Sequence, residues 1–184
     1  MIVRTKNIVR ILLGTAFLLM VPLVAMQMTD EVVWGPEDFV AAGILIGGTG
    51  LLYELAVSQV SLTAYRVAVG STLGTALLLV WTNLAVGLIG SEGNPANLMY
   101  VGVLAVGVIG AVVVHLEPRG MARTLFATAI AQALVPMIAI AVWRSLGSDL
   151  TKVLGANAFF VSLWVGSALL FFRAGARLHT QPAG

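Results

Sequence analysis

The sequence predicts an all-α fold, a polytopic transmembrane helical bundle of six spans with both termini in the cytoplasm. Six apolar stretches, each long enough to cross a bilayer, are joined by short connectors that alternate in charge. Only 10% of the 184 residues are charged, whereas soluble domains carry about 25%. Since 59% are hydrophobic, too few polar side chains remain to cover a surface in water. We therefore expect one integral membrane domain over residues 1–184.

The apolar stretches set the predicted helices. Crossing about 30 Å of hydrocarbon takes roughly 20 helical residues. The predicted spans are residues 8–28, 37–57, 66–90, 97–116, 121–143 and 152–173. Their continuous apolar character favours helices over barrel strands, in which apolar and polar side chains alternate.

Local signals support these spans in order. The first span follows basic residues, as a secretory signal does, but exceeds the roughly 7–15 residues of a signal core, so we expect it to be uncleaved. Residues 35–38 (Gly-Pro-Glu-Asp) place a proline and two acids at the start of the second span. Asn94 is expected to cap the fourth span, with Pro95 following it. Pro22 and Pro136 lie inside the first and fifth spans and should bend them.

Charged residues divide between the two faces of the predicted bundle. Eight of the ten basic residues fall on one face: Arg4, Lys6, Arg10, Arg66, Arg119, Arg123, Arg173 and Arg177. Six acids fall on the other, where Arg144 and Lys152 also lie: Asp30, Glu31, Glu37, Asp38, Glu92 and Asp149. The positive-inside rule therefore predicts that both termini are cytoplasmic.

Spans two and three resemble spans four and five, which suggests an internal repeat. Gly47 and Gly50 match Gly107 and Gly110, and further matches follow the connectors. Parallel repeats of this kind occur in transporters. Similar small residues are also expected at any membrane helix contact, so both explanations stay open.

Two GxxxG pairs, Gly43/Gly47 and Gly70/Gly74, are predicted to be helix-packing positions. Lipid is as apolar as leucine, so membrane helices associate through close backbone contact, which small residues allow. Packing within one bundle is favoured, and a dimer face is the alternative.

Glu54 is the one acid inside a predicted span, about one turn from its cytoplasmic end. An intramembrane carboxylate is costly and suggests function, such as binding a proton or a cationic ligand. So near the boundary, the side chain can also reach the interface and pair with Arg66 or Arg123, and this structural role is favoured.

Three amides and one histidine complete the candidate polar or ligand-facing residues. Asn83, Gln132 and Asn157 lie in the third, fifth and sixth spans and need partners in an apolar setting. They predict either hydrogen bonds between helices or, less strongly, a small polar pocket that opens to the periplasm. His115 is expected to end span four as an interfacial residue, although a histidine can also carry a proton.

The composition excludes several kinds of site. The chain has no cysteine, so disulfides and thiol chemistry are excluded. No histidine spacing predicts a zinc site, and the one acid of residues 91–100 is too few for a calcium loop. The basic residues form no stripe, so no nucleic-acid partner is expected. We expect no catalytic residue, metal or cofactor, and the expected partners are the lipid bilayer and another membrane protein or a second copy.

Residues 81–132 resemble a group of small, uncharacterised multi-pass bacterial inner-membrane proteins. The resemblance rests on residues 83–87 (Asn-Leu-Ala-Val-Gly), residues 91–100, which contain Asn-Pro-Ala-Asn-Leu-Met-Tyr, and residues 118–123 (Pro-Arg-Gly-Met-Ala-Arg). It implies a bacterial inner-membrane location and no catalytic residue.

Three functions compete on these observations. The favoured one is a non-enzymatic membrane protein that serves as an accessory or interaction subunit, because the loops are too short for a soluble catalytic domain. A small transporter or channel is the alternative, and it requires Glu54, Asn83, Gln132 and Asn157 to line one cavity. The least favoured is a lipid-modifying enzyme at the cytoplasmic face, built on Glu54 with the polar residues of 115–123, because no nucleophile accompanies them.

Overall fold

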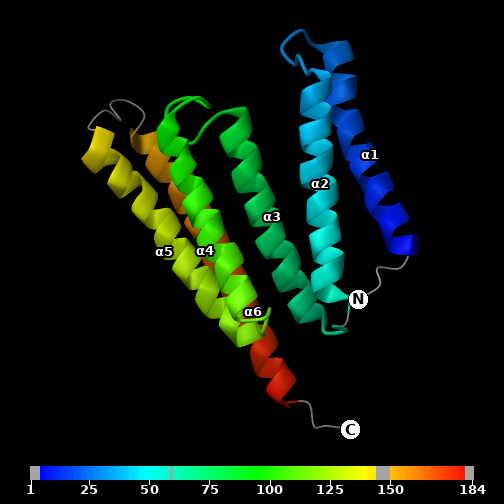
Figure 1. The fold of residues 1–184 in the computed structure, drawn as a ribbon, viewed down its shortest axis with the longest axis vertical. Coiled ribbons are helices and arrows are strands. Elements are labelled where there is room, and N and C mark those ends of the chain that lie inside the picture. Colours follow the sequence, from blue (N-terminus) through cyan, green and yellow to red (C-terminus); the bar gives the residue numbers. More distant parts are fainter. Residues whose placement is uncertain (1–4, 59, 144–149, 181–184) are drawn as a thin grey trace. The chain divides into compact units, whose positions relative to one another are not determined.

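The computed structural model describes residues 5–58, 60–143 and 150–180. Within these ranges every regular element is a helix (Figure 1). The elements are α1 (Thr5–Met28), α2 (Pro36–Val57), α3 (Thr63–Ala85), the 3-10 helix η1 (Pro95–Leu98), α4 (Met99–Val113), α5 (Pro118–Trp143) and α6 (Leu150–Thr180). Six helical segments are long and apolar enough to cross a membrane. The prediction of an all-helical membrane fold is confirmed at this level.

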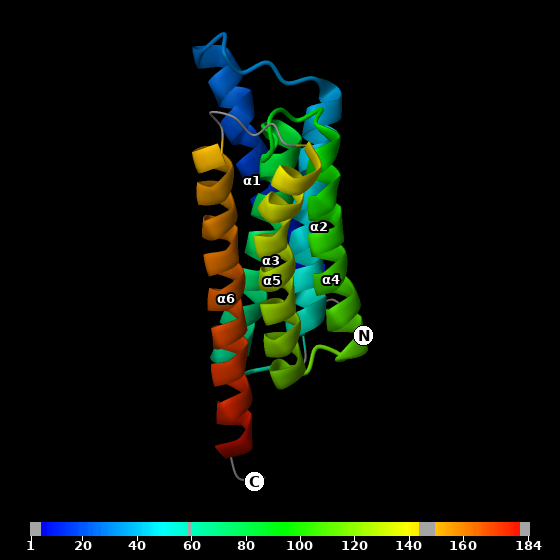
Figure 2. The same cartoon turned by 90° about the vertical axis from the view of Figure 1, so that its left-hand side faces the viewer.

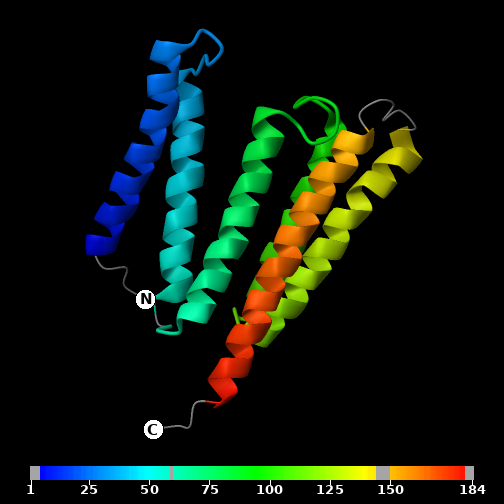
Figure 3. The same ribbon diagram turned by 180° about the vertical axis from the view of Figure 1, so that it is seen from behind.

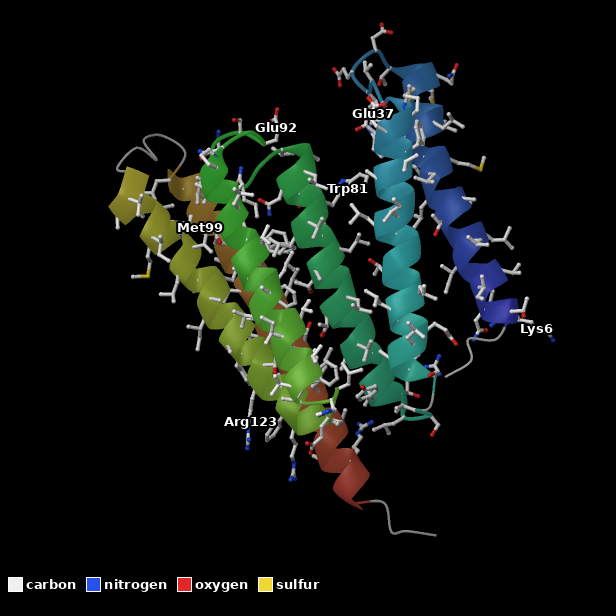
Figure 4. All side chains as sticks on the ribbon, viewed as in Figure 1. Lys6, Glu37, Trp81, Glu92, Met99 and Arg123 are labelled. Atoms are coloured by element: carbon white, nitrogen blue, oxygen red, sulfur yellow. The ribbon has the colours of Figure 1, made fainter. Side chains whose placement is uncertain are left out.

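The chain forms two compact units, Met1–Gln59 (unit 1) and Val60–Gly184 (unit 2). Unit 1 is a hairpin of α1 and α2, and unit 2 contains the remaining helices. Within unit 1, Lys6 and Glu37 lie at opposite ends of the hairpin (Figure 4). Since the predicted repeat compares helices of both units, it stays a prediction.

Three glycines in the middle of α2 face α1. A Cβ built on Gly43 would lie 3.7 Å from Leu19 Cδ1, and one on Gly47 would lie 3.6 Å from Thr15 Oγ1. One turn further, a Cβ on Gly50 would lie 2.9 Å from Ile11 Cγ2. The Gly43/Gly47 pair thus lies between two helices of one chain, where small residues let the backbones approach.

In unit 2, helix α6 packs against both α5 and α3, and α4 packs against α5 (Figures 2 and 3). Seven buried side chains of α6, beside which Ala168 is also buried, recur at alternating steps of four and three residues: Val153, Asn157, Phe160, Trp164, Ser167, Phe171 and Ala174. This is the seam spacing of closely packed helices. The seam includes Asn157, so the sequence pattern itself carries a polar group into the interior.

Glycines also set the approach of α4 to α5. A Cβ on Gly107 would lie 3.5 Å from Thr128 Oγ1, and one on Gly110 would collide with the side chain of Thr124, 3.1 Å from its Cβ. The two threonines are one turn apart on α5, as the two glycines are on α4. The Gly70/Gly74 pair differs, because Gly74 is exposed and a Cβ there would meet no heavy atom within 4 Å, while Gly70 is half-buried.

Two predicted ends differ from the ends of the helices by more than three residues. Helix α3 ends at Ala85 rather than at residue 90, because Gly87 and Gly90 have φ values of 75° and 71°, which right-handed helices exclude. Helix α6 continues to Thr180, beyond the predicted end at residue 173. The predicted starts were closer, since Pro36 and Pro95 begin their helices as expected.

Candidate functional site: a buried polar cluster in unit 2

Three polar side chains from three helices meet inside unit 2. Tyr100 comes from the first turn of α4, Gln132 from the middle of α5 and Asn157 from α6. Their exposed fractions are 2%, 0% and 2%. We call Tyr100, Gln132 and Asn157 the polar cluster. The sequence predicted two of its members, and the structure brings those two together.

Asn157 is the hub of the polar cluster. Its Oδ1 accepts hydrogen bonds from Gln132 Nε2 at 3.0 Å and from the Tyr100 hydroxyl at 3.2 Å. Its Nδ2 donates to the Tyr100 oxygen at 2.9 Å and to the Val153 carbonyl at 2.8 Å. Both ends of this amide are therefore satisfied, as a buried amide requires.

Gln132 is less well satisfied than Asn157. Its Oε1 is buried and has no hydrogen-bond partner among the described groups. Two other buried polar atoms of unit 2, Asn83 Oδ1 and Trp164 Nε1, are also without a partner there. An unpaired buried acceptor costs about 1–3 kcal/mol. Within the polar cluster, Gln132 Oε1 is thus the acceptor that is free to take a hydrogen bond from a further donor.

The chemistry of the polar cluster is neutral. It contains two carboxamides and a phenol, and no carboxylate, imidazole or ammonium group. Such groups orient and hold one another through hydrogen bonds, but they cannot neutralise a charged ligand. Across the described ranges, no three His, Asp or Glu side chains are close enough together to hold a metal ion.

Asn83, predicted to share a pocket with Gln132 and Asn157, bonds within its own helix. Its Nδ2 donates to the Leu79 carbonyl at 3.0 Å. Elsewhere along α3, the hydroxyls of Ser71 and Ser167 form a hydrogen bond of 2.7 Å between α3 and α6. The described contact between these helices therefore uses two serines that the sequence did not single out.

Glu54 lies in unit 1 and accepts a hydrogen bond from Asn7 Nδ2. Asn7 is on α1, one helical turn before Ile11, which faces Gly50 of α2. The side chains of Asn7 and Glu54 are half-buried. The expected partners Arg66 and Arg123 belong to unit 2, so that pairing stays a prediction. The structure instead gives the carboxylate a neutral donor inside its own hairpin.

His115 lies two residues beyond the end of its helix rather than at the end, and its expected interfacial position stays a prediction. Helix α4 ends at Val113, and His115 and Leu116 adopt φ values of 51° and 60°. His115 is exposed, while the Leu116 carbonyl accepts a hydrogen bond from Tyr65 at 3.1 Å. Two successive left-handed residues cost free energy. The tight turn they form lets α5 start directly beside the end of α4.

Residues 86–98 form an ordered loop built around Asn97. Its Oδ1 accepts from the amides of Leu88 at 3.1 Å and Ile89 at 2.9 Å, and its Nδ2 donates to the Ser91 carbonyl at 2.7 Å. Asn94 caps η1 by accepting from the Ala96 amide, as expected. The amides of this distinctive stretch therefore bind the backbone of their own loop.

Besides Ser71 and Ser167, two partners of the predicted site residues were missed from the sequence, Tyr100 and Asn7. Tyr100 stands out only as a hydroxyl at the edge of a long apolar run, and Asn7 only as an amide among basic residues. Each bonds to a residue at least 47 positions away, so helix register decides the pairing. The usable signal for Asn7 was the spacing of the glycines of α2. If those glycines are aligned with the facing residues of α1, Asn7 comes to lie opposite Glu54.

Comparison of the chain with family models, with curated proteins and with solved structures finds no match.

Proposed function

We propose that this chain is a non-enzymatic accessory or interaction subunit of a membrane assembly, located in a bacterial inner membrane with both termini in the cytoplasm. One observation carries the proposal. The candidate polar side chains within the helices bond to one another or to their own helix inside each unit. Asn7 pairs with Glu54 in unit 1, and in unit 2 Asn83 bonds to its own helix while the polar cluster bonds internally.

This internal bonding weakens the transporter alternative. A path for a polar solute needs polar groups that line one cavity. In unit 2, Gln132 donates to Asn157, which also bonds to Tyr100, so these side chains bind one another. Connectors of less than a dozen residues add no soluble domain that could do chemistry. What remains is an apolar helical protein suited to packing against others.

Photo-crosslinking from α1 tests this proposal. Phe17 is 70% exposed, whereas Thr15 on the same helix is buried against α2. A photoreactive residue at position 17 should yield one adduct of defined protein mass in native membranes, at a yield that tracks the abundance of the chain. The same residue at position 15 should crosslink only within the hairpin. Adducts of lipid alone at every exposed position of α1 and α2 would contradict a subunit role.

A small transporter remains the second candidate, because of the unpaired acceptors Gln132 Oε1 and Asn83 Oδ1 in unit 2. Purified chain in proteoliposomes tests it with H⁺, Na⁺ and K⁺ as probes. Flux that exceeds empty vesicles and disappears in Gln132→Met would favour the transporter over the subunit. Equal leakage with and without protein would remove it.

A further inference from the structure

One end of unit 2 collects arginines from three helices. Two contacts identify this end: Tyr65 donates to the Leu116 carbonyl at 3.1 Å, and a Cβ on Gly175 would lie 3.1 Å from Arg119 Cγ. The start of α3, the end of α4, the start of α5 and the last third of α6 therefore meet. Figure 4 shows Arg123 at this end and Glu92 at the opposite one.

Five exposed arginines lie here, and we call them the basic end: Arg66, Arg119, Arg123, Arg173 and Arg177. Among the described residues, Glu117 is the acid at this end of unit 2. Five positive charges and one negative charge leave a strong positive excess. All five are arginine rather than lysine, and the planar guanidinium matches a phosphate with two parallel hydrogen bonds.

The start of α5 contributes to this excess. The first turn of helix α2 carries Glu37 and Asp38, and Asp38 Oδ2 accepts from the Gly35 amide at 2.8 Å. The first turn of helix α5 has no acid and carries Arg119, Arg123 follows one turn later, and Glu117 lies immediately before the helix. Cations at the positive end of a helix are unfavourable. An anion from outside the chain would add to the single carboxylate of Glu117 at the start of α5.

The length of α6 allows its arginines, Arg173 and Arg177, to reach the depth of lipid headgroups. Its 31 residues extend about 46 Å, compared with about 30 Å of hydrocarbon. Phe172, 61% exposed, immediately precedes Arg173. An aromatic ring beside a cation is typical of the membrane interface, where the ring meets acyl chains and the cation meets phosphates.

We propose that the basic end is a binding surface for the phosphate headgroups of anionic phospholipids. The surface charge complements such lipids, and helices that end there bring it to their depth. Each arginine near an anionic bilayer strengthens binding about fivefold. This inference is independent of the subunit proposal, since it concerns lipid rather than a protein partner.

Native mass spectrometry of the purified full chain tests the surface, with phosphatidylglycerol and phosphatidylcholine of the same acyl chains as probes. The double variant Arg123→Gln/Arg173→Gln should bind phosphatidylglycerol about 25-fold more weakly, by the same factor applied twice. Lys152→Gln, at the opposite end of α6, is the matched control and should change binding less than twofold. Thermal unfolding of each variant confirms that it is folded.

Four outcomes would overturn the proposal. The first three are equal binding of the two lipids by the wild-type chain, unchanged phosphatidylglycerol binding by the double variant, and the same loss in the Lys152→Gln control. The fourth is displacement of phosphatidylglycerol by a hexaglutamate peptide at lower concentration than by free lipid. That result would assign the basic end to an acidic protein segment.

Discussion

Tyr100 and Asn157, 57 positions apart in the sequence, form two hydrogen bonds across the interior of unit 2. The tyrosine hydroxyl donates to Oδ1 at 3.2 Å and accepts from Nδ2 at 2.9 Å. With Gln132 as the third member, α4, α5 and α6 are tied at one level. Because the surroundings are apolar, no water competes for these groups, and the polar cluster specifies how the three helices align.

Replacing Asn157 with leucine should destabilise the protein by about 2 kcal/mol or more, because Tyr100 and Gln132 each lose a buried partner. Unfolding in mixed micelles of increasing denaturing detergent measures the change. Ser162→Ala is the matched control, since the Ser162 hydroxyl is exposed and bonds within α6. It should shift the unfolding free energy by less than about 0.5 kcal/mol. Equal effects of both substitutions would contradict a cluster that aligns helices.

Gln132→Met should behave differently from Asn157→Leu. It removes one hydrogen bond but also removes the unpaired Oε1, while Asn157 Oδ1 still accepts from Tyr100. These effects offset each other, so we expect a change within about 1 kcal/mol in the same unfolding assay. A loss as large as that of Asn157→Leu would mean that Oε1 has a bound partner in the membrane, which is what a transporter pocket requires.

Gly110→Ala should destabilise unit 2 by about 2 kcal/mol, because the new methyl group would overlap the Thr124 side chain and force α4 away from α5. Gly102→Ala on the same helix is the control. A Cβ there meets no heavy atom within 4 Å, so the higher helix propensity of alanine should leave stability unchanged or slightly raised. Detergent unfolding of the two variants in parallel decides the matter, and equal stabilities would contradict the close contact of α4 with α5.

Helix starts could be predicted from the sequence, whereas the register of one helix against another could not. The starts of α2 and η1 followed from Pro36, Asn94 and Pro95, whose preferences depend on immediate neighbours. The end of α3 was wrong because glycine permits a left-handed turn without requiring one. In the folded protein the turn requires glycine at position 87, since a Cβ there would collide with the Ser91 carbonyl.

The candidate site shows the same division. Gln132 and Asn157 were predicted because an amide in an apolar run must find a partner. That they bond to each other depends on the register of α5 against α6. This register is set by the packing of side chains along both helices. Tyr100 enters through a third helix, and no spacing within α4 indicates it.

Asn97→Ala should loosen the loop of residues 86–98, because the amides of Leu88 and Ile89 lose their shared acceptor. Hydrogen exchange at these two amides should accelerate about tenfold or more. Asn97→Asp keeps an acceptor and should retain more protection than alanine does. Glu92→Ala, at an exposed position of the same loop, is the control and should leave both amides unchanged. Equal exchange in the alanine variant and the wild type would contradict the role of Asn97.

Asn7 and Glu54 should be energetically coupled, because they form a hydrogen bond between α1 and α2, one turn beyond the contact of Gly50 with Ile11. A double-mutant cycle of Asn7→Ala and Glu54→Ala should give a coupling energy of about 1–2 kcal/mol, typical of a hydrogen bond to a charged acceptor. Unfolding of the single and double variants in mixed micelles measures it.

Thr49 provides the control for this cycle. It lies on α2 near Glu54, and its hydroxyl donates to the Leu45 carbonyl of its own helix at 2.7 Å. Asn7→Ala and Thr49→Ala should therefore add within about 0.5 kcal/mol. If Asn7 and Glu54 are also additive, the carboxylate is held by something other than Asn7. A Glu54→Gln variant then separates the possibilities, because an amide preserves a neutral hydrogen bond but abolishes an ion pair with an arginine.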